Sequence, residues 1–246
     1  MNESAYFAYL MTGLIFVVAM LYSSVGHGGA SGYLAMLSLF GVAATTARPT
    51  ALILNLFVSA IAATQYIRKG FFSFRLFAGF AVASVPLAFI GGMLRLPFGA
   101  YRAVLGVVLL VAAIRLATDL REPENFCWPN LAVSVIIGAA IGFVSGLVGV
   151  GGGIFLTPIL LFMKWADAKT AAGVSALFIF VNSLAALVGM PISADAVSQE
   201  SISWLAAALL GGLIGSRLGA GFLRTLTLRR LLAAVLVVAA AKLFFV

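Results

Sequence analysis

The chain has 246 residues, of which 63% are hydrophobic and 9% are charged, and its mean hydropathy is +1.18. A soluble domain carries roughly a quarter charged residues, so this composition excludes an ordinary soluble protein and places most of the surface in lipid. The net charge of +8 comes from 15 basic and 7 acidic residues. No basic cluster is longer than Arg68-Lys69 or Arg229-Arg230, so we expect no nucleic-acid partner. Basic residues between apolar runs are typical of cytoplasmic loops.

The chain has one cysteine, Cys127, and one histidine, His27. These numbers exclude an intrachain disulfide and a cysteine-built metal site, and we expect neither a metal nor a cofactor. The amino-terminal residues 1–4 carry no basic charge, so we expect the first apolar run to remain as a membrane span rather than to be a cleaved signal peptide.

Ten apolar runs follow one another along the chain. They cover residues 7–25, 29–41, 48–67, 74–94, 98–118, 131–149, 152–163, 170–190, 201–222 and 226–245. Eight approach the roughly 20 residues that cross a bilayer as a helix. The second and seventh are too short and each follows a glycine cluster, which predicts two half-helices.

The second half of the chain repeats the first. At an offset of 123, Gly26, Gly28 and Gly29 fall on Gly149, Gly151 and Gly152. The most polar stretch of the chain separates the halves. We therefore predict a first membrane repeat at 1–120, a cytoplasmic linker at 121–130 and a second membrane repeat at 131–246.

The loop charges favour opposite orientations for the two repeats. Arg68, Lys69 and Arg75 surround the connection after the third run, whereas the equivalent connection at 190–200 has two acids and no base. Under the positive-inside rule these loops lie on opposite membrane faces, with the amino terminus outside. The predicted fold is an all-α polytopic membrane protein with two inverted repeats of about five helical segments, each with one short helix. If the short runs only dip into the membrane and return, the repeats are parallel.

The glycine clusters are the strongest functional signal. Gly149-Val-Gly-Gly-Gly-Ile-Phe-Leu-Thr-Pro158 and its partner Gly26-His-Gly-Gly-Ala-Ser-Gly32 each precede a short helix. Glycine lets the backbone unwind and approach a ligand, and the free amides at a helix amino terminus favour an anion. The alternative is that the glycines only permit close helix packing. The candidate substrate-binding glycines are Gly26, Gly28, Gly29, Gly149, Gly151, Gly152 and Gly153.

Several polar side chains complete the candidate site. His27 in the first glycine cluster could donate to an anion or titrate near neutral pH, or could be a satisfied structural histidine. Arg48 could attract anions, or reach to the membrane interface with its apolar stem buried. The polar residues within the apolar runs are also candidates for substrate binding, with hydrogen bonding between helices as their alternative. They are Asn55, Ser59, Asn182 and Ser183, and an offset of 123 aligns Ser59 with Asn182.

With its duplicated glycine motif in a chain of about 250 residues, the sequence resembles the TauE/SafE sulfite exporter family, from about residue 10 to the end. The second half matches the motif at Gly149, Gly151, Gly152, Gly153 and Pro158. In the first half His27, Ala30 and Ala35 depart from it, which leaves the substrate open. The resemblance implies a permease of bacterial inner membranes that carries sulfite, sulfonates or other sulfur-containing anions.

All seven acids lie at chain ends or in loops, and proton or sodium pumps usually place a carboxylate within the membrane. We therefore expect export across the lipid bilayer that is driven by the membrane potential and the substrate gradient, without a carboxylate relay. The resemblance implies that the partner carried is a small inorganic or organosulfur anion. A cation channel or permease that uses broken-helix carbonyls stays open as an alternative. A homodimer also stays open. One histidine and no buried aspartate argue against an enzyme, and paired broken helices argue against a structural scaffold.

Overall fold

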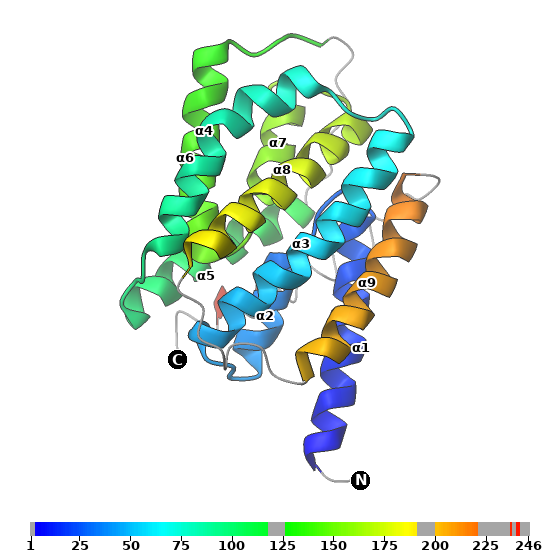
Figure 1. The fold of residues 1–246 in the computed structure, drawn as a ribbon, viewed down its shortest axis with the longest axis vertical. Coiled ribbons are helices and arrows are strands. Elements are labelled where there is room, and N and C mark those ends of the chain that lie inside the picture. Colours follow the sequence, from blue (N-terminus) through cyan, green and yellow to red (C-terminus); the bar gives the residue numbers. More distant parts are fainter. Residues whose placement is uncertain (1–2, 118–125, 191–199, 221–236, 238–239, 242–246) are drawn as a thin grey trace.

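The computed structural model describes residues 3–117, 126–190, 200–220, 237 and 240–241. Within these residues the regular secondary structure is helical (Figure 1). The helices are α1 (Glu3–Ser23), α2 (Ala30–Leu39), α3 (Ala44–Arg68), α4 (Phe74–Met93), α5 (Phe98–Ala117), α6 (Leu131–Val148), α7 (Gly153–Phe162), α8 (Ala168–Gly189) and α9 (Glu200–Gly219). Five of them, α3, α4, α6, α8 and the part of α9 from residue 202, are long and apolar enough to cross a membrane.

These helices confirm the predicted all-α architecture of a multi-pass membrane protein. The runs predicted for the first nine segments match the helices to within a few residues at most ends. Most of the tenth run, the acidic loop at 191–199 and the linker residues 121–125 lie outside the described residues. The domain limits and the inverted orientation of the repeats stay predictions.

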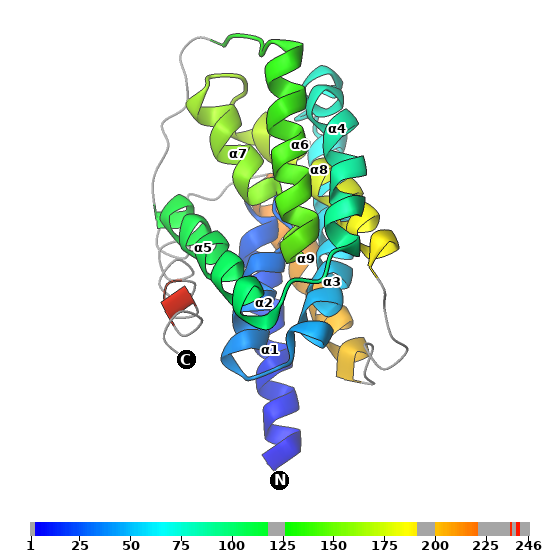
Figure 2. The same ribbon diagram turned by 90° about the vertical axis from the view of Figure 1, so that its left-hand side faces the viewer.

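The two short segments are half-helices, as the sequence predicts. α2 and α7 have 10 residues each. At about 1.5 Å per residue, each spans about half of a hydrocarbon core about 30 Å thick. In two views at right angles α7 lies toward one end of the molecule and α2 toward the other (Figures 1 and 2).

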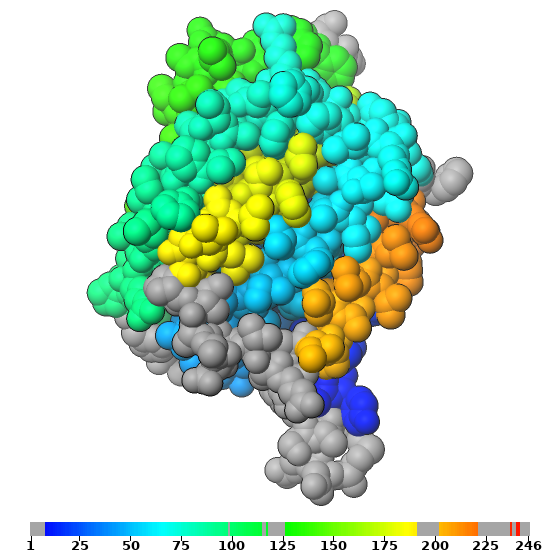
Figure 3. Space-filling model, viewed as in Figure 1, coloured from blue at the N-terminus to red at the C-terminus, as the bar shows by residue number. Residues whose placement is uncertain are grey.

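The helices of the two halves interleave. α4 packs on α6, α1 on α9 and α3 on α8, so each of these pairs joins a helix before the linker to one after it. On one face of the molecule α8 lies between α4 and α3, with α9 beyond α3 (Figure 3). The halves are therefore not two separate bodies placed side by side.

Glycines spaced four residues apart make two of these pairs very close. A Cβ on any of three glycines of α6 would meet a backbone carbonyl of α4, and three glycines of α9 stand in the same relation to α1. Small residues at this spacing let membrane helices pack backbone against backbone. The α6–α4 pairs are Gly138 with Phe80, Gly142 with Ser84 and Gly146 with Ala88, and the α9–α1 pairs are Gly211 with Phe16, Gly215 with Met20 and Gly219 with Ser24, the residue directly after α1.

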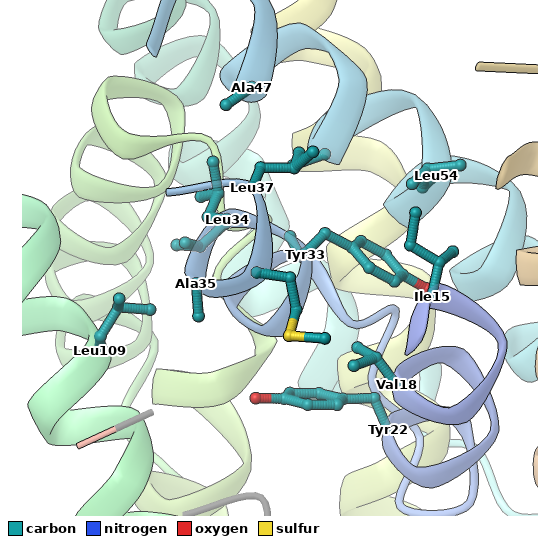
Figure 4. Close-up of a cluster of buried hydrophobic side chains, with 14 of the residues drawn as sticks. Ile15, Val18, Tyr22, Tyr33, Leu34, Ala35, Leu37, Ala47, Leu54 and Leu109 are labelled. Carbon is teal, nitrogen blue, oxygen red and sulfur yellow. The ribbon is translucent and has the colours of Figure 1, made fainter. Parts of the chain in front are cut away.

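Side chains from neighbouring helices surround α2. Eight of its ten residues are buried. A ten-residue helix is too short to be stable alone, so packing against its neighbours holds it in place. The cluster drawn in Figure 4 joins Tyr33, Leu34, Ala35 and Leu37 of α2 to Ile15, Val18 and Tyr22 of α1, Ala47 and Leu54 of α3, and Leu109 of α5.

Helix α8 begins with a carboxylate cap whose pKa gives a testable pH dependence. Asp167 accepts hydrogen bonds from the amides of Lys169 and Thr170, at 2.9 Å each, and from the Thr170 hydroxyl at 2.6 Å. Burial by itself would raise the pKa of Asp167, but these hydrogen bonds outweigh it and lower the pKa below its ordinary 3.8. The cap therefore contributes stability above pH 3.8 that is lost as the pH falls through the lowered pKa.

We expect Asp167→Ala to cost about 1 kcal/mol at pH 7, because the cap is lost. Asp167→Asn should keep the cap and remove the titration. Thermal unfolding of the detergent-solubilised protein between pH 7 and pH 3 should show the wild type losing stability relative to Asp167→Asn. Parallel pH profiles for these two proteins would contradict the assignment.

Candidate functional site

Both glycine clusters form buried loops whose backbone only glycine adopts readily. In the first glycine loop (residues 26–29), Gly26 and Gly29 have φ angles of 75° and 97°. In the second glycine loop (residues 149–152), Gly149, Gly151 and Gly152 have φ angles of 91°, 74° and 84°. L-residues with a Cβ rarely adopt such values. Gly29 and Gly152 directly precede α2 and α7, so each loop delivers the chain to the amino terminus of a half-helix.

Asn55, from the middle of α3, lies between the two loops. Its Oδ1 accepts a hydrogen bond from the amide of Ala30, the first residue of α2, at 3.1 Å. Its Nδ2 donates to Ser183 Oγ of α8 at 2.8 Å. A Cβ on Gly28 would meet Oδ1, and a Cβ on Gly151 would meet Nδ2. One side chain therefore touches both loops, and the structure brings Asn55 and Ser183 together with the glycines.

Equivalent glycines of the two loops have different neighbours. A Cβ on Gly26 would meet Ala172 of α8, whereas one on Gly149 would meet Arg48 of α3. The nearest atoms to a Cβ on Gly28 all belong to Asn55, whereas one on Gly151 would meet Asn55, Ser183 and Ile179. The surroundings of the two loops are therefore not identical, and the correspondence of Ser59 with Asn182 stays a prediction.

Two predicted site residues hydrogen-bond away from the loops. Ser59 Oγ donates to the Leu56 carbonyl of its own helix at 3.1 Å. Asn182 receives a hydrogen bond from Ser84 of α4 at 2.8 Å and donates to the Phe178 carbonyl at 2.9 Å. Both side chains are buried. Asn182 makes the hydrogen bond between helices that is its alternative role, whereas the Ser59 bond stays within α3. Substrate binding by either residue stays a prediction.

His27 links the first glycine loop to the second half. Its Nδ1 donates to the Val25 carbonyl at 2.9 Å, and its Nε2 lies 3.4 Å from Thr157 Oγ1 of α7. The Thr157 hydroxyl in turn donates to Ser175 of α8 at 2.8 Å. The ring is 7% exposed. His27 is thus held between α7 and its own loop, which fits the structural alternative and leaves its role toward an anion a proposal.

Arg48 does not reach to the membrane interface, and that alternative is wrong. The side chain is only 8% exposed and donates to carbonyls at the carboxyl-terminal ends of two helices. The distances are 2.6 Å to Gly146 of α6, and 3.2 Å, 3.5 Å and 3.2 Å to Gly91, Gly92 and Leu94 at the end of α4. A helix carboxyl terminus carries about half a negative charge, so two ends offset much of the guanidinium charge. Its Cγ would lie 2.8 Å from a Cβ on Gly149.

The glycine loops are closely packed in this conformation. A Cβ on Gly26 would lie 2.5 Å from the Ala172 carbonyl oxygen, and one on Gly152 would lie 2.5 Å from Ser145 Oγ. These contacts are those of the close-packing alternative. Anion binding at the loops, the other interpretation of these glycines, stays a prediction.

Comparison with known proteins identifies the family. The family model for the sulfite exporter TauE/SafE matches residues 11–243. The probable membrane transporter protein y4hK of Sinorhizobium fredii (strain NBRC 101917 / NGR234) is 40% identical over 235 residues, 94% of this chain and 95% of that protein. The probable membrane transporter protein YjnA of Bacillus subtilis (strain 168) is 26% identical over 225 residues, 83% and 87% of the two chains. No solved structure matches the chain. The protein is a membrane transporter and belongs to the sulfite exporter TauE/SafE family.

Proposed function

We propose that the protein exports a small anion, such as sulfite or an organosulfur anion, across the inner membrane. The observation that carries this proposal is the meeting of both glycine loops at Asn55. Since α2 and α7 follow these loops and extend toward opposite ends of the molecule (Figure 2), their amino termini both lie toward this residue. Two amino termini provide amide donors and the positive ends of two helix dipoles for an anion.

The same arrangement supports inverted repeats, and the loop charges place the amino terminus of this proposed arrangement outside. Equivalent half-helices that approach one centre from opposite ends are what an inverted repeat produces. The interleaved pairs α4 with α6 and α9 with α1 involve equivalent helices of the two halves, as a two-fold relation requires.

The buried charges favour an anion over a cation. Among the described residues, Arg48 is the buried charged side chain, and no carboxylate is buried. The ends of α4 and α6 offset much of the guanidinium charge, and the amino termini of α2 and α7 add the positive ends of two helix dipoles. Cation permeases instead direct carbonyls or carboxylates at the ion.

Proteoliposomes loaded with sulfite or a sulfonate test the proposal. An interior-negative potential of about 100 mV is worth about 2.3 kcal/mol for each charge, so a potassium-diffusion potential should favour efflux of a monovalent anion by about fiftyfold at equilibrium. We expect efflux to depend on the protein and to accelerate when the potential is imposed. Efflux unaffected by the potential would contradict potential-driven export. Currents that persist when every permeant anion is replaced by gluconate would indicate the cation channel.

A further inference from the structure

Buried hydrogen-bond donors without an acceptor gather at the glycine loops. Among the described residues, four buried polar side-chain atoms have no hydrogen-bond partner. Three of them lie beside a glycine of these loops: Ser145 Oγ at Gly152, Tyr33 Oη at Gly29, and Nε of Arg48, whose Cγ approaches Gly149. An unpartnered buried donor costs about 1–3 kcal/mol. Such a cluster is the expected state of a site whose acceptor is a ligand.

Of these three unpartnered donors, the Ser145 hydroxyl is the clearest candidate to bind a ligand. It lies in the last turn of α6 and its side chain is 1% exposed. Its carbonyl accepts the amides of Gly149 and Val150, at 2.8 Å and 3.2 Å, so its backbone shapes the second glycine loop. Its hydroxyl lies 2.5 Å from the position of a Cβ on Gly152, the residue that precedes α7. The hydroxyl therefore faces the amino terminus of α7 with no acceptor of its own.

The amino termini of α2 and α7 differ in whether a side chain already accepts a hydrogen bond from their first amides. At α2 the first amide, that of Ala30, already has an acceptor in Asn55 Oδ1. At α7 the place of Asn55 is taken by Ile179, whose Cδ1 approaches Gly153. In the part of the chain that the structure describes, no side chain accepts a hydrogen bond from Gly153 or Ile154. The α2 end carries its own acceptor, and the α7 end lacks one.

We infer that the amino terminus of α7 is the primary anion subsite, and that Ser145 donates its hydroxyl to an oxygen of the bound anion. This inference rests on the proposed function and assigns the ligand a chemical class. An oxyanion with at least two acceptor oxygens can accept from the α7 amides with one oxygen and from Ser145 with another. The site is asymmetric despite the repeat, because the counterpart of Ser145 at an offset of 123 is Tyr22, whose hydroxyl accepts from Ser31 at 3.1 Å.

The test compares Ser145→Ala with Ser134→Ala. Both serines lie on α6 and are buried, but Ser134 Oγ already donates to the Asn130 carbonyl at 3.2 Å. Sulfite binding to the purified proteins is measured by calorimetry, and unfolding of the sulfite-free proteins by thermal melting. We expect Ser145→Ala to weaken sulfite binding about tenfold, with an unfolding temperature equal to or above that of the wild type. Ser134→Ala should bind sulfite as the wild type does.

The two hypotheses fail in different ways. If the wild type binds neither sulfite nor a sulfonate, the proposed function fails and the subsite falls with it. If the wild type binds and Ser145→Ala binds equally well, the subsite is wrong and the proposed function stands. A Ser145→Ala protein that loses stability in proportion to affinity would assign the hydroxyl a structural role and would also overturn the subsite.

Discussion

Replacement of Arg48 by methionine should lower the free energy of unfolding by about 3 kcal/mol and abolish transport. The guanidinium donates to carbonyls at the ends of α4 and α6, and methionine would leave these buried acceptors without their charged donor. The second glycine loop begins directly after α6, so loosening this end should also displace it. Unfolding in detergent and uptake into proteoliposomes measure the two effects.

Arg95→Met is the matched control, because Arg95 is exposed in the connection after α4. Arg95→Met should change the free energy of unfolding by no more than about 0.5 kcal/mol and should leave transport unchanged. Arg48→Lys should recover only part of the stability, since an ammonium group on a single stem cannot span both helix ends as the planar guanidinium does. An Arg48→Met protein as stable as Arg95→Met would show that the bridge between α4 and α6 contributes nothing.

Conversion of Asn55 to aspartate should leave the protein folded and reduce anion transport at least a hundredfold. One carboxylate oxygen can still accept from the Ala30 amide, the helix amino terminus favours the negative charge, and the Ser183 hydroxyl can turn to donate. A carboxylate at this point would repel a substrate anion. Two like charges about 4 Å apart repel by about 4 kcal/mol at an effective dielectric constant of about 20. Radiolabelled sulfite uptake below saturation measures the loss.

Asn130→Asp provides the control for this change. Asn130 also accepts from a helix amide, that of Ala132 at 2.9 Å, but it is exposed at the start of α6. Aspartate is an equally good cap there, so transport should be unchanged. If Asn55→Asp carries sulfite as fast as Asn130→Asp, the anion does not pass near Asn55 and the proposed site between the two glycine loops is wrong.

The parts of the fold that the sequence predicts are those that depend on a single chain segment and not on contacts between distant segments. Apolar length predicts the spanning helices, and glycine clusters before truncated runs predict α2 and α7, which begin at Ala30 and Gly153. The glycines that adopt positive φ in both loops are among the predicted site residues, because glycine is the residue that this backbone requires.

The remaining site features depend on contacts between distant segments. Arg48 looks like an interfacial residue because it lies near the start of its helix, and only the fold shows that the ends of α4 and α6 surround it. Ser145 is a small residue inside an apolar run, and its significance comes from the absence of a partner.

The interleaving of the helices determines which parts can move as rigid units. Backbone contact ties α4 to α6 and α1 to α9, so neither sequence repeat can swing as a block without breaking both pairs. α3 packs on α8 at least as extensively as it packs on α9, so the packing of the described helices runs continuously from one half of the chain to the other. The Asn55–Ser183 hydrogen bond also joins α3 to α8. A movement that exposes the glycine loops to one side of the membrane therefore has to tilt or slide helices that belong to both repeats.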